Sequence, residues 1–171
     1  MAGAHRAAGR RAALAWIGAL ALCSTLAHAA RAQGSGNEAL TRIDDLRALA
    51  VQVRKEQRPL LLFFSTPGCP FCLQVRRNYL APRVRDGEKS GVTIREVEIT
   101  ASRSFVGLDG KPISEYAFAG SYNVRMVPAV LLVDAGMKPL VDPLIGIGAA
   151  DFYEAFLAEA IETASRKLRS R

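Results

Sequence analysis

Apolar residues recur at two different spacings along the chain, and each spacing predicts a different kind of element. Between residues 38 and 55 they return every three or four positions with charged residues between them, which predicts an amphipathic helix. Two continuous apolar runs, residues 60–64 and 129–133, are too short for helices and are typical of strands covered on both faces. A last amphipathic helix is predicted over residues 149–168.

Weaker patterns fill the intervals between these runs. A helix is expected to open at Pro70, because the missing N–H of proline would be unpaired at a first helical position in any case. Residues 92–99 are interpreted as a strand whose apolar positions change phase, which predicts a bulge or burial on both faces. Residues 100–121 are the least regular part and contain a turn and a short helix over 113–119. A fourth strand is expected over residues 139–145.

The elements alternate between helix and strand and end with two consecutive strands and a helix. This order predicts an α/β fold with a mixed central sheet of about four strands, flanked by helices on both faces. With 171 residues, 50% of them hydrophobic and 23% charged, the chain matches one ordinary globular domain with a short tail. Disordered, collagenous and multi-spanning membrane proteins are excluded by this composition.

The first 29 residues have the features of a secretory signal peptide. Three arginines precede an apolar stretch, and a small-x-small triplet follows it at residues 27–29. A second such triplet at residues 30–32 leaves cleavage after either Ala29 or Ala32. A retained membrane anchor is the alternative, but the apolar run over residues 12–27 is shorter than the ~20 residues that cross a bilayer.

The predicted organisation is therefore a signal peptide over residues 1–29, a short flexible leader over 30–37 and one folded domain over 38–171. Removal of the signal peptide lowers the formal net charge from +7 to +4, because 20 of the 23 Lys and Arg remain against the same 16 acids. This modest, scattered excess favours a solvated surface over nucleic-acid binding. The mature chain keeps no histidine, no tryptophan and only two cysteines, Cys69 and Cys72.

Four interpretations compete for this cysteine pair. A structural zinc site needs about four Cys or His ligands, and one subunit offers only two. Haem attachment through C-x-x-C-H is excluded because Leu73 stands in the place of the histidine. A purely structural disulfide would close a very short loop, which gives far less than the ~3 kcal/mol of a 15-residue loop.

A redox-active dithiol is the interpretation that local physics favours. In the first turn of a helix, unpaired backbone N–H groups and the helix dipole stabilise a thiolate, which is the attacking species in disulfide exchange. Cys69 lies at the expected loop-to-helix junction and should be exposed, whereas Cys72 lies one turn further on and should be shielded. We therefore expect Cys69 to react with a partner and Cys72 to resolve the mixed disulfide.

Residues 60–157 resemble thioredoxin-fold proteins of the exported bacterial type. The resemblance rests on the strand 60–64, the Cys-Pro-Phe-Cys motif that opens a helix, and Val127-Pro128 before a predicted hairpin. It implies that the bond before Pro128 is cis, that Pro128 packs against the disulfide, and that the backbone of Val127 pairs with a bound peptide. The segment 109–128 is in addition similar to thioredoxin-related periplasmic proteins of the SoxW type.

Departures from cytosolic thioredoxins bear on the direction of electron flow. Phe63 occupies the position of their buried acid, Gly68 replaces their tryptophan, and Pro70-Phe71 replaces the Gly-Pro between the cysteines. Without that acid, rapid general disulfide reduction is in doubt. The absence of a histidine between the cysteines argues against a strongly oxidising site, because a cation there would stabilise the thiolate.

The sequence thus predicts a periplasmic thiol–disulfide oxidoreductase with Cys69 and Cys72 as catalytic residues. Pro70, Phe71, Val127 and Pro128 are its expected substrate-binding residues. Its expected partners are protein thiols and disulfides and a membrane electron donor that keeps it reduced. We expect a monomer that binds no cofactor, metal or nucleic acid. The alternatives are a non-catalytic binding module with a structural disulfide and, less well supported without histidine, a copper-delivery protein.

Overall fold

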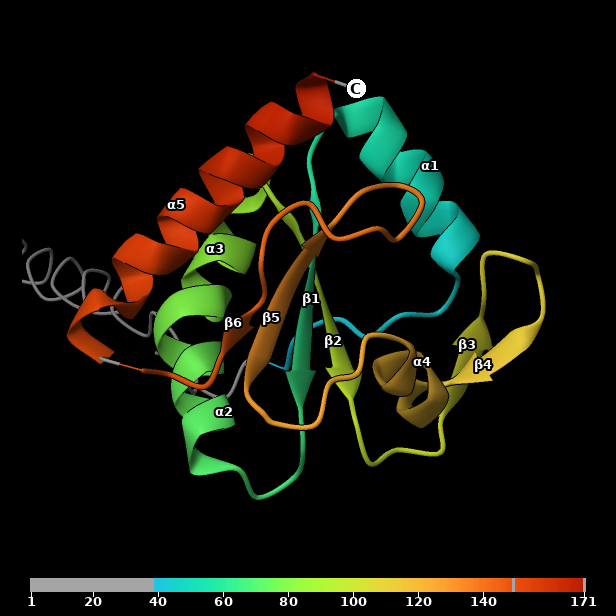
Figure 1. The fold of residues 1–171 in the computed structure, drawn as a ribbon, viewed down its shortest axis with the longest axis horizontal. Helices are drawn as coiled ribbons and strands as arrows, with labels where there is room; N and C mark the ends of the chain where they lie inside the picture. Colours follow the sequence, from blue (N-terminus) through green and yellow to red (C-terminus); the bar gives the residue numbers. More distant parts are fainter. Residues whose placement is uncertain (1–38, 149, 171) are drawn as a thin grey trace, which may run out of the picture. The chain divides into compact units, whose positions relative to one another are not determined.

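A four-stranded mixed sheet forms the centre of the described part of the chain, residues 39–148 and 150–170 of this computed structural model (Figure 1). The strand order is β2-β1-β5-β6, in which β1 and β2 run parallel and the other two pairs run antiparallel. The four strands are β1 (Leu60–Ser65), β2 (Thr93–Glu98), β5 (Ala129–Val133) and β6 (Leu144–Ile145). The predicted α/β class and mixed sheet of about four strands are confirmed.

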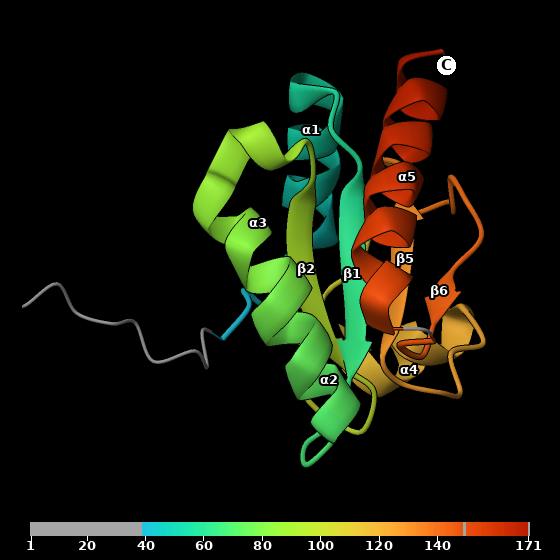
Figure 2. The same cartoon turned by 90° about the vertical axis from the view of Figure 1, so that its left-hand side faces the viewer.

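Helices cover both faces of this sheet (Figure 2). Along β1, Leu60, Leu62 and Phe64 pack on one face with α1 and α4, while Leu61 and Phe63 pack on the other with α2 and α5. All six positions of β1 are buried because the sheet is covered twice, and this explains the continuous apolar run. The helices are α1 (Leu46–Glu56), α2 (Pro70–Val75), η1 (Arg76–Leu80), α3 (Ala81–Asp86), η2 (Gly87–Ser90), α4 (Glu115–Ser121) and α5 (Ala150–Arg169).

The first helix is shorter than predicted, because α1 begins at Leu46 instead of residue 38. Asp45 stops it on the N-terminal side: its backbone is extended, and its carboxylate accepts the N–H of Arg47 as a helix cap. The preceding residues run extended along the edge of β2, where the N–H of Glu96 donates to the carbonyl of Thr41 at 2.9 Å. Their buried apolar side chains had matched the helical spacing by coincidence.

The irregular segment 100–121 contains a hairpin that the sequence did not predict. Its strands are β3 (Ser104–Val106) and β4 (Pro112–Ser114), paired antiparallel. The short helix α4 follows at once, and it begins at Glu115 instead of residue 113 because the Ser114 hydroxyl caps the N–H of Ala117.

For β2 the structure has one of the two predicted alternatives. β2 pairs with β1 in unbroken register from Leu60↔Thr93 to Ser65↔Glu98, so burial on both faces, and not a bulge, accounts for its change of phase. The expected fourth strand needs correction. The last strand is only β6, because the residues from 139 onward make a single bridge, Val133↔Pro139, before the chain leaves the sheet.

The predicted signal peptide (residues 1–29) and leader (30–37) lie outside the described residues. Among the helices that are described, none combines the length and apolar character needed to cross a membrane.

Candidate active site

Cys69 and Cys72 lie where the chain leaves the end of β1 and enters a helical run. Cys69 is the N-cap of α2, with extended backbone, and is joined to Cys72 by a disulfide with a Cα–Cα distance of 5.2 Å. The backbone N–H of Cys72 donates to the Sγ of Cys69 at 3.1 Å. This donor would also stabilise a thiolate on Cys69 after reduction.

The two cysteines differ in exposure, as the sequence predicts. Cys69 is half-buried, whereas Cys72 is only 1% exposed and packs in the core beneath α2 and α5. Cys69 is therefore the more accessible of the two residues. This is the asymmetry that a pair of attacking and resolving cysteines needs.

A wide turn lies in the helical run that carries the cysteines. The residues of η1 form a π turn in which the N–H of Ala81 donates to the carbonyl of Arg76. Pro82 stands just after it, and a proline both lacks an N–H and crowds the carbonyl four residues before it, so a wider turn accommodates it.

The loop before β5 comes to the same end of the sheet as the cysteines. The pairing of β1 with β5 ends at Phe64↔Ala129. Pro128, the residue before Ala129, therefore lies near the point where β1 leads toward Cys69. The Val127–Pro128 peptide bond is cis, as the resemblance implies. Pro128 is buried and its carbonyl accepts the N–H of Gly146 at 2.7 Å, while Val127 is half-buried against the core.

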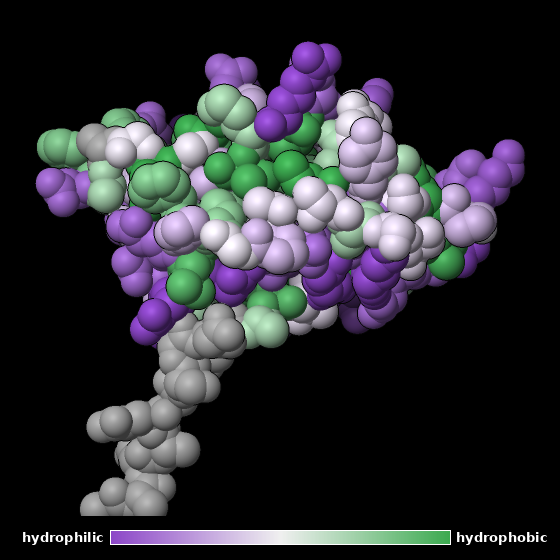
Figure 3. All heavy atoms as spheres, turned by 90° about the horizontal axis from the view of Figure 1, so that it is seen from below, coloured by the Kyte–Doolittle hydropathy of each residue, from purple (hydrophilic) through white to green (hydrophobic). Residues whose placement is uncertain are grey.

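Exposed apolar side chains come from the elements around this end of the sheet. Phe71 is 58% exposed, which confirms that it faces outward, and Pro70 beside it is exposed as well. Met126, before the cis bond, and Ile145, in β6, are also exposed. Figure 3 views the end where β1 stops and α2 begins, and shows both hydrophobic and hydrophilic residues exposed on that face.

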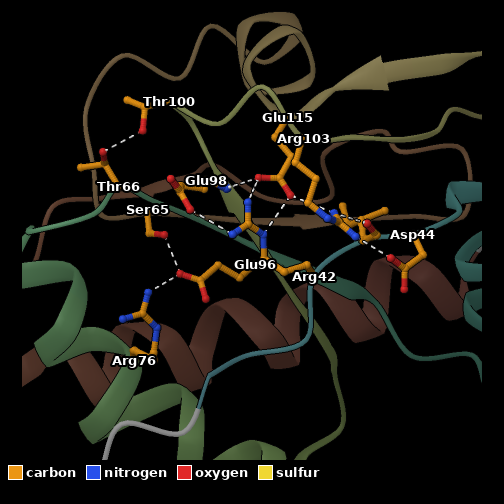
Figure 4. Close-up of polar contacts among 11 residues, drawn as sticks. Arg42, Asp44, Ser65, Thr66, Arg76, Glu96, Glu98, Thr100, Arg103 and Glu115 are labelled. Carbon is orange, nitrogen blue, oxygen red and sulfur yellow. Dashed lines mark hydrogen bonds and ion pairs between the residues drawn. The ribbon is translucent and has the colours of Figure 1, made fainter.

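A cavity of about 490 Å³ opens on the β2 side of Cys69. Two ion pairs contribute to its wall, Arg76 with Glu96 and Arg42 with Glu98 (Figure 4). Its lining residues are Ala39, Arg42, Ser65, Thr66, Pro67, Gly68, Cys69, Pro70, Leu73, Arg76, Glu96 and Glu98.

Glu96 is the site residue that sequence reasoning missed. It lies opposite Phe63 in the β1–β2 register, so a carboxylate stands on the strand next to the position where the related proteins have their acid. It is 7% exposed, accepts a hydrogen bond from the Ser65 hydroxyl at 2.5 Å and pairs with Arg76. The Arg76 guanidinium lies 5.8 Å from the centre of the Phe63 ring. The sequence feature that could have identified Glu96 is the presence of charged residues inside β2, whose other residues are mostly apolar.

A second polar cluster adjoins the cavity through Arg42. Its guanidinium donates to both Glu98 and the fully buried Glu115. The hydrogen bond with Glu115 is the main reason why the pKa of Arg42 is held above its ordinary value. Arg42 thus links the cavity to the segment that contains α4. Among the described residues, no three Cys, His, Asp or Glu side chains are grouped so that they could hold a metal ion.

Comparison with known proteins gives one family and several solved structures. The model of a family described as a thioredoxin-like domain matches residues 46–160. The comparison with curated protein sequences gave no match.

The solved structures with similar folds include three of particular interest. A thioredoxin-fold protein from Helicobacter pylori is 22% identical, with a TM-score of 0.48, and the match covers 67% of this chain and 81% of that one. DsbH oxidoreductase is 18% identical, with a TM-score of 0.50 and coverage of 72% and 86%. The periplasmic thioredoxin SoxS from Paracoccus pantotrophus is 18% identical, with a TM-score of 0.43 and coverage of 63% and 99%. At these identities the likeness concerns the fold alone.

Proposed function

The chain belongs to the thioredoxin-like domain family, and from this premise we propose that it is an exported thiol–disulfide oxidoreductase acting on partner proteins. Cys69 and Cys72 are the catalytic residues. In the reducing direction, the Cys69 thiolate attacks a partner disulfide and forms a mixed disulfide. Cys72 then attacks the Sγ of Cys69, which releases the reduced partner and closes the Cys69–Cys72 disulfide.

The observation that carries this proposal is the unequal burial of two bonded cysteines at a helix start. Cys69 is accessible and accepts a backbone N–H, which stabilises the thiolate that attacks or leaves. Cys72 is buried and already within bonding distance, so it competes effectively with any outside thiol. A disulfide kept for stability alone does not need this difference in burial between its two cysteines.

We assign partner binding to the residues around Cys69. Pro70 and Phe71 provide an exposed apolar contact, and Val127 and Pro128 supply the loop against which a partner segment lies. Burial of apolar area favours such a contact, and the loss of freedom on association offsets part of this gain.

Reduction is the favoured direction. No histidine stands between the cysteines, so the site lacks a cation that would stabilise the thiolate and make it strongly oxidising. In an oxidising periplasm a reductant needs continuous resupply, which calls for a membrane electron donor. The predicted leader sequence and the periplasmic setting belong to this proposal, as does a monomeric state.

Trapping with Cys72→Ala tests the catalytic assignment. Without the resolving thiol, Cys69 should remain covalently bound to partner proteins when the full chain is expressed in its native envelope. Non-reducing gels followed by mass spectrometry would identify the complexes. The matched control is Cys69→Ala, which leaves only the buried sulfur and should capture nothing.

The same experiment separates the enzyme from the alternative, a binding module with a stable disulfide. Such a module would capture no protein covalently in either variant, and that outcome would refute the oxidoreductase proposal.

A further inference from the structure

A cavity with charged residues in its wall adjoins Cys69. We propose that it binds small disulfides that carry both an ammonium and a carboxylate group, of the amino-acid type, and presents them to Cys69. The inference rests on the proposed oxidoreductase function and adds a substrate class to it. Partner proteins would use the apolar side of the site, and small zwitterionic disulfides would use the cavity.

The cavity has the size and position that such a substrate requires. Its volume of about 490 Å³ falls within the ~300–1,000 Å³ of typical ligand sites. Cys69 forms part of its wall, so a molecule lying in it has its sulfur atoms next to the reactive one. Leu73, which is 37% exposed, adds an apolar surface for the methylene groups of the ligand.

Both signs of charge are present in the wall. Arg76 and Arg42 can bind a carboxylate, and Glu98 and Glu96 can accept hydrogen bonds from an ammonium group. The Arg76 side chain is 18% exposed beside its partner Glu96, so part of it is open to the cavity. The side chain of Glu98 remains 24% exposed, so its carboxylate is open to a ligand.

This charge arrangement selects against other occupants. An apolar peptide segment would desolvate the two ion pairs of the wall without offering them any polar group in return, which is unfavourable. A simple anion would meet Glu96 and Glu98, and a simple cation would meet Arg42 and Arg76. A zwitterion gives each of these groups an opposite charge.

The reaction balances within the protein and the small disulfide. The thiolate of reduced Cys69 attacks one sulfur of the disulfide, whose S–S bond breaks and releases the first thiol. Cys72 then attacks the Sγ of Cys69 and expels the second thiol. Two electrons and the two dithiol protons pass to the substrate, and the Cys69–Cys72 disulfide forms.

The test compares two disulfides that carry both ammonium and carboxylate groups, one of amino-acid size and one of peptide size, with a neutral disulfide. The reduced full chain is mixed separately with cystine, glutathione disulfide and the neutral bis(2-hydroxyethyl) disulfide, and mass spectrometry follows oxidation of the peptide with residues 69–72. Each rate constant is divided by that of a free Cys-Pro-Phe-Cys peptide, which corrects for the intrinsic reactivity of each disulfide. We expect the corrected rate constant to be about tenfold higher for a zwitterionic disulfide than for the neutral one.

Variants of the cavity wall test whether the preference for zwitterionic disulfides arises in the cavity. Arg76→Gln and Glu98→Gln should each lower the zwitterion-to-neutral ratio by about threefold or more. Their matched controls are Arg77→Gln and Glu88→Gln, two exposed residues outside the cavity wall, which should leave the ratio unchanged. A ratio cancels any general change in Cys69 reactivity. Glu98→Gln, on the more exposed ion pair, keeps the test decisive if Arg76→Gln fails to fold.

The outcomes separate this inference from the proposed function. Preference for cystine alone supports a site of amino-acid size, preference for glutathione disulfide alone supports a peptide thiol, and preference for both supports recognition of the shared charges. Equal corrected rates, or a preference that neither cavity variant lowers, would overturn the inference while leaving the oxidoreductase intact. A chain that reacts with none of the three faster than the free peptide would also overturn the inference, whereas failure of the Cys72→Ala trap is what would overturn the oxidoreductase proposal.

Discussion

Glu115 is a fully buried carboxylate whose two oxygens are held by charged and backbone donors. It accepts hydrogen bonds from Arg42 and Arg103 and from the backbone N–H of Glu98 at 3.0 Å. Glu115→Gln would remove the buried counter-charge that Arg42 and Arg103 share and leave them only their more exposed partners, Glu98 and Asp44. We expect it to lower the free energy of unfolding by about 3 kcal/mol. Urea unfolding of both proteins measures the difference.

Glu162→Gln is the matched control for this change. Glu162 pairs with Arg166 on the exposed surface of α5, where an ion pair contributes about 0.5 kcal/mol or less. If Glu115→Gln costs no more than Glu162→Gln, the buried cluster does not stabilise the fold as argued.

Tyr153 carries a buried hydroxyl without a hydrogen-bond partner among the described residues. Burial raises its pKa to about 12, with a smaller contribution from Tyr79. Between pH 10 and pH 12 the unfolded chain loses this proton first, so stability contributed by Tyr153 falls as the pH rises. Tyr153→Phe should remove that part of the alkaline loss and leave the free energy of unfolding at pH 7 unchanged or up to about 1 kcal/mol higher. Urea unfolding midpoints of both proteins at pH 7, 10 and 11 measure this difference in alkaline stability. A variant that is less stable than the parent chain at pH 7 would contradict the prediction.

The site residues that the sequence predicts are those whose chemistry is visible without a partner strand. Two cysteines at a helix start, with an aromatic residue between them, can be interpreted from the chain alone. Glu96 could not be assigned in this way, because its significance depends on facing Phe63 across a strand pair and Arg76 from a helix. Contacts between residues so far apart in sequence are set by strand register, which local patterns do not specify.

At the scale of elements, the cap of α1 gives a pH-dependent prediction. Asp45 accepts hydrogen bonds from the side chain and backbone of Arg47, and these lower the pKa of its carboxyl from 3.8 to about 2. As the pH falls from about 4 to 2, the unfolded chain binds this proton first, so the stability from Asp45 is present above pH 4 and is lost toward pH 2.

Asp45→Asn tests this contribution, because asparagine caps helices about as well but does not titrate. We expect the unfolding midpoint of the variant to fall less than that of the parent chain between pH 5 and pH 2. The difference should shrink in high salt, which screens an exposed pair. If the unfolding midpoints of the two chains fall equally between pH 5 and pH 2, the Asp45 carboxylate does not contribute the stability assigned to it.

Elements buried on both faces were predicted well, and element ends were predicted poorly. The runs that became β1 and β5 are apolar at every position because helices cover the sheet twice. The start of α1 was misplaced because Ile43, in an extended edge segment, is buried like a helical core residue. The hairpin β3–β4 has only three residues in each strand, too few for an alternating pattern to stand out.

At the scale of the whole molecule, the sheet brings two different surfaces to one pair of sulfurs. The loop before β5 and the start of α2 supply apolar groups, whereas β2 and the segment before α1 supply charged ones. Because the two surfaces lie on different sides of Cys69, substitutions on one side should change one class of substrate and not the other.

The direction of electron flow can be tested through stability, because oxidation and folding form one thermodynamic cycle. If the chain is a reductant, its disulfide forms more readily in the folded than in the unfolded state, so the oxidised form must resist unfolding better. Each 30 mV between the folded and unfolded potentials corresponds to about 1.4 kcal/mol of this difference. We expect the oxidised protein to unfold at higher urea than the protein in dithiothreitol, with the same circular dichroism spectrum before unfolding.

A double variant, Cys69→Ser with Cys72→Ser, provides the control for that comparison. It has no bridge at the site, so dithiothreitol should not move its unfolding midpoint. A reduced form more stable than the oxidised one would assign the chain as an oxidant instead. Unfolding of the chain on reduction would exclude reversible exchange, since a catalytic disulfide must open while the sheet and helices around it stay in place.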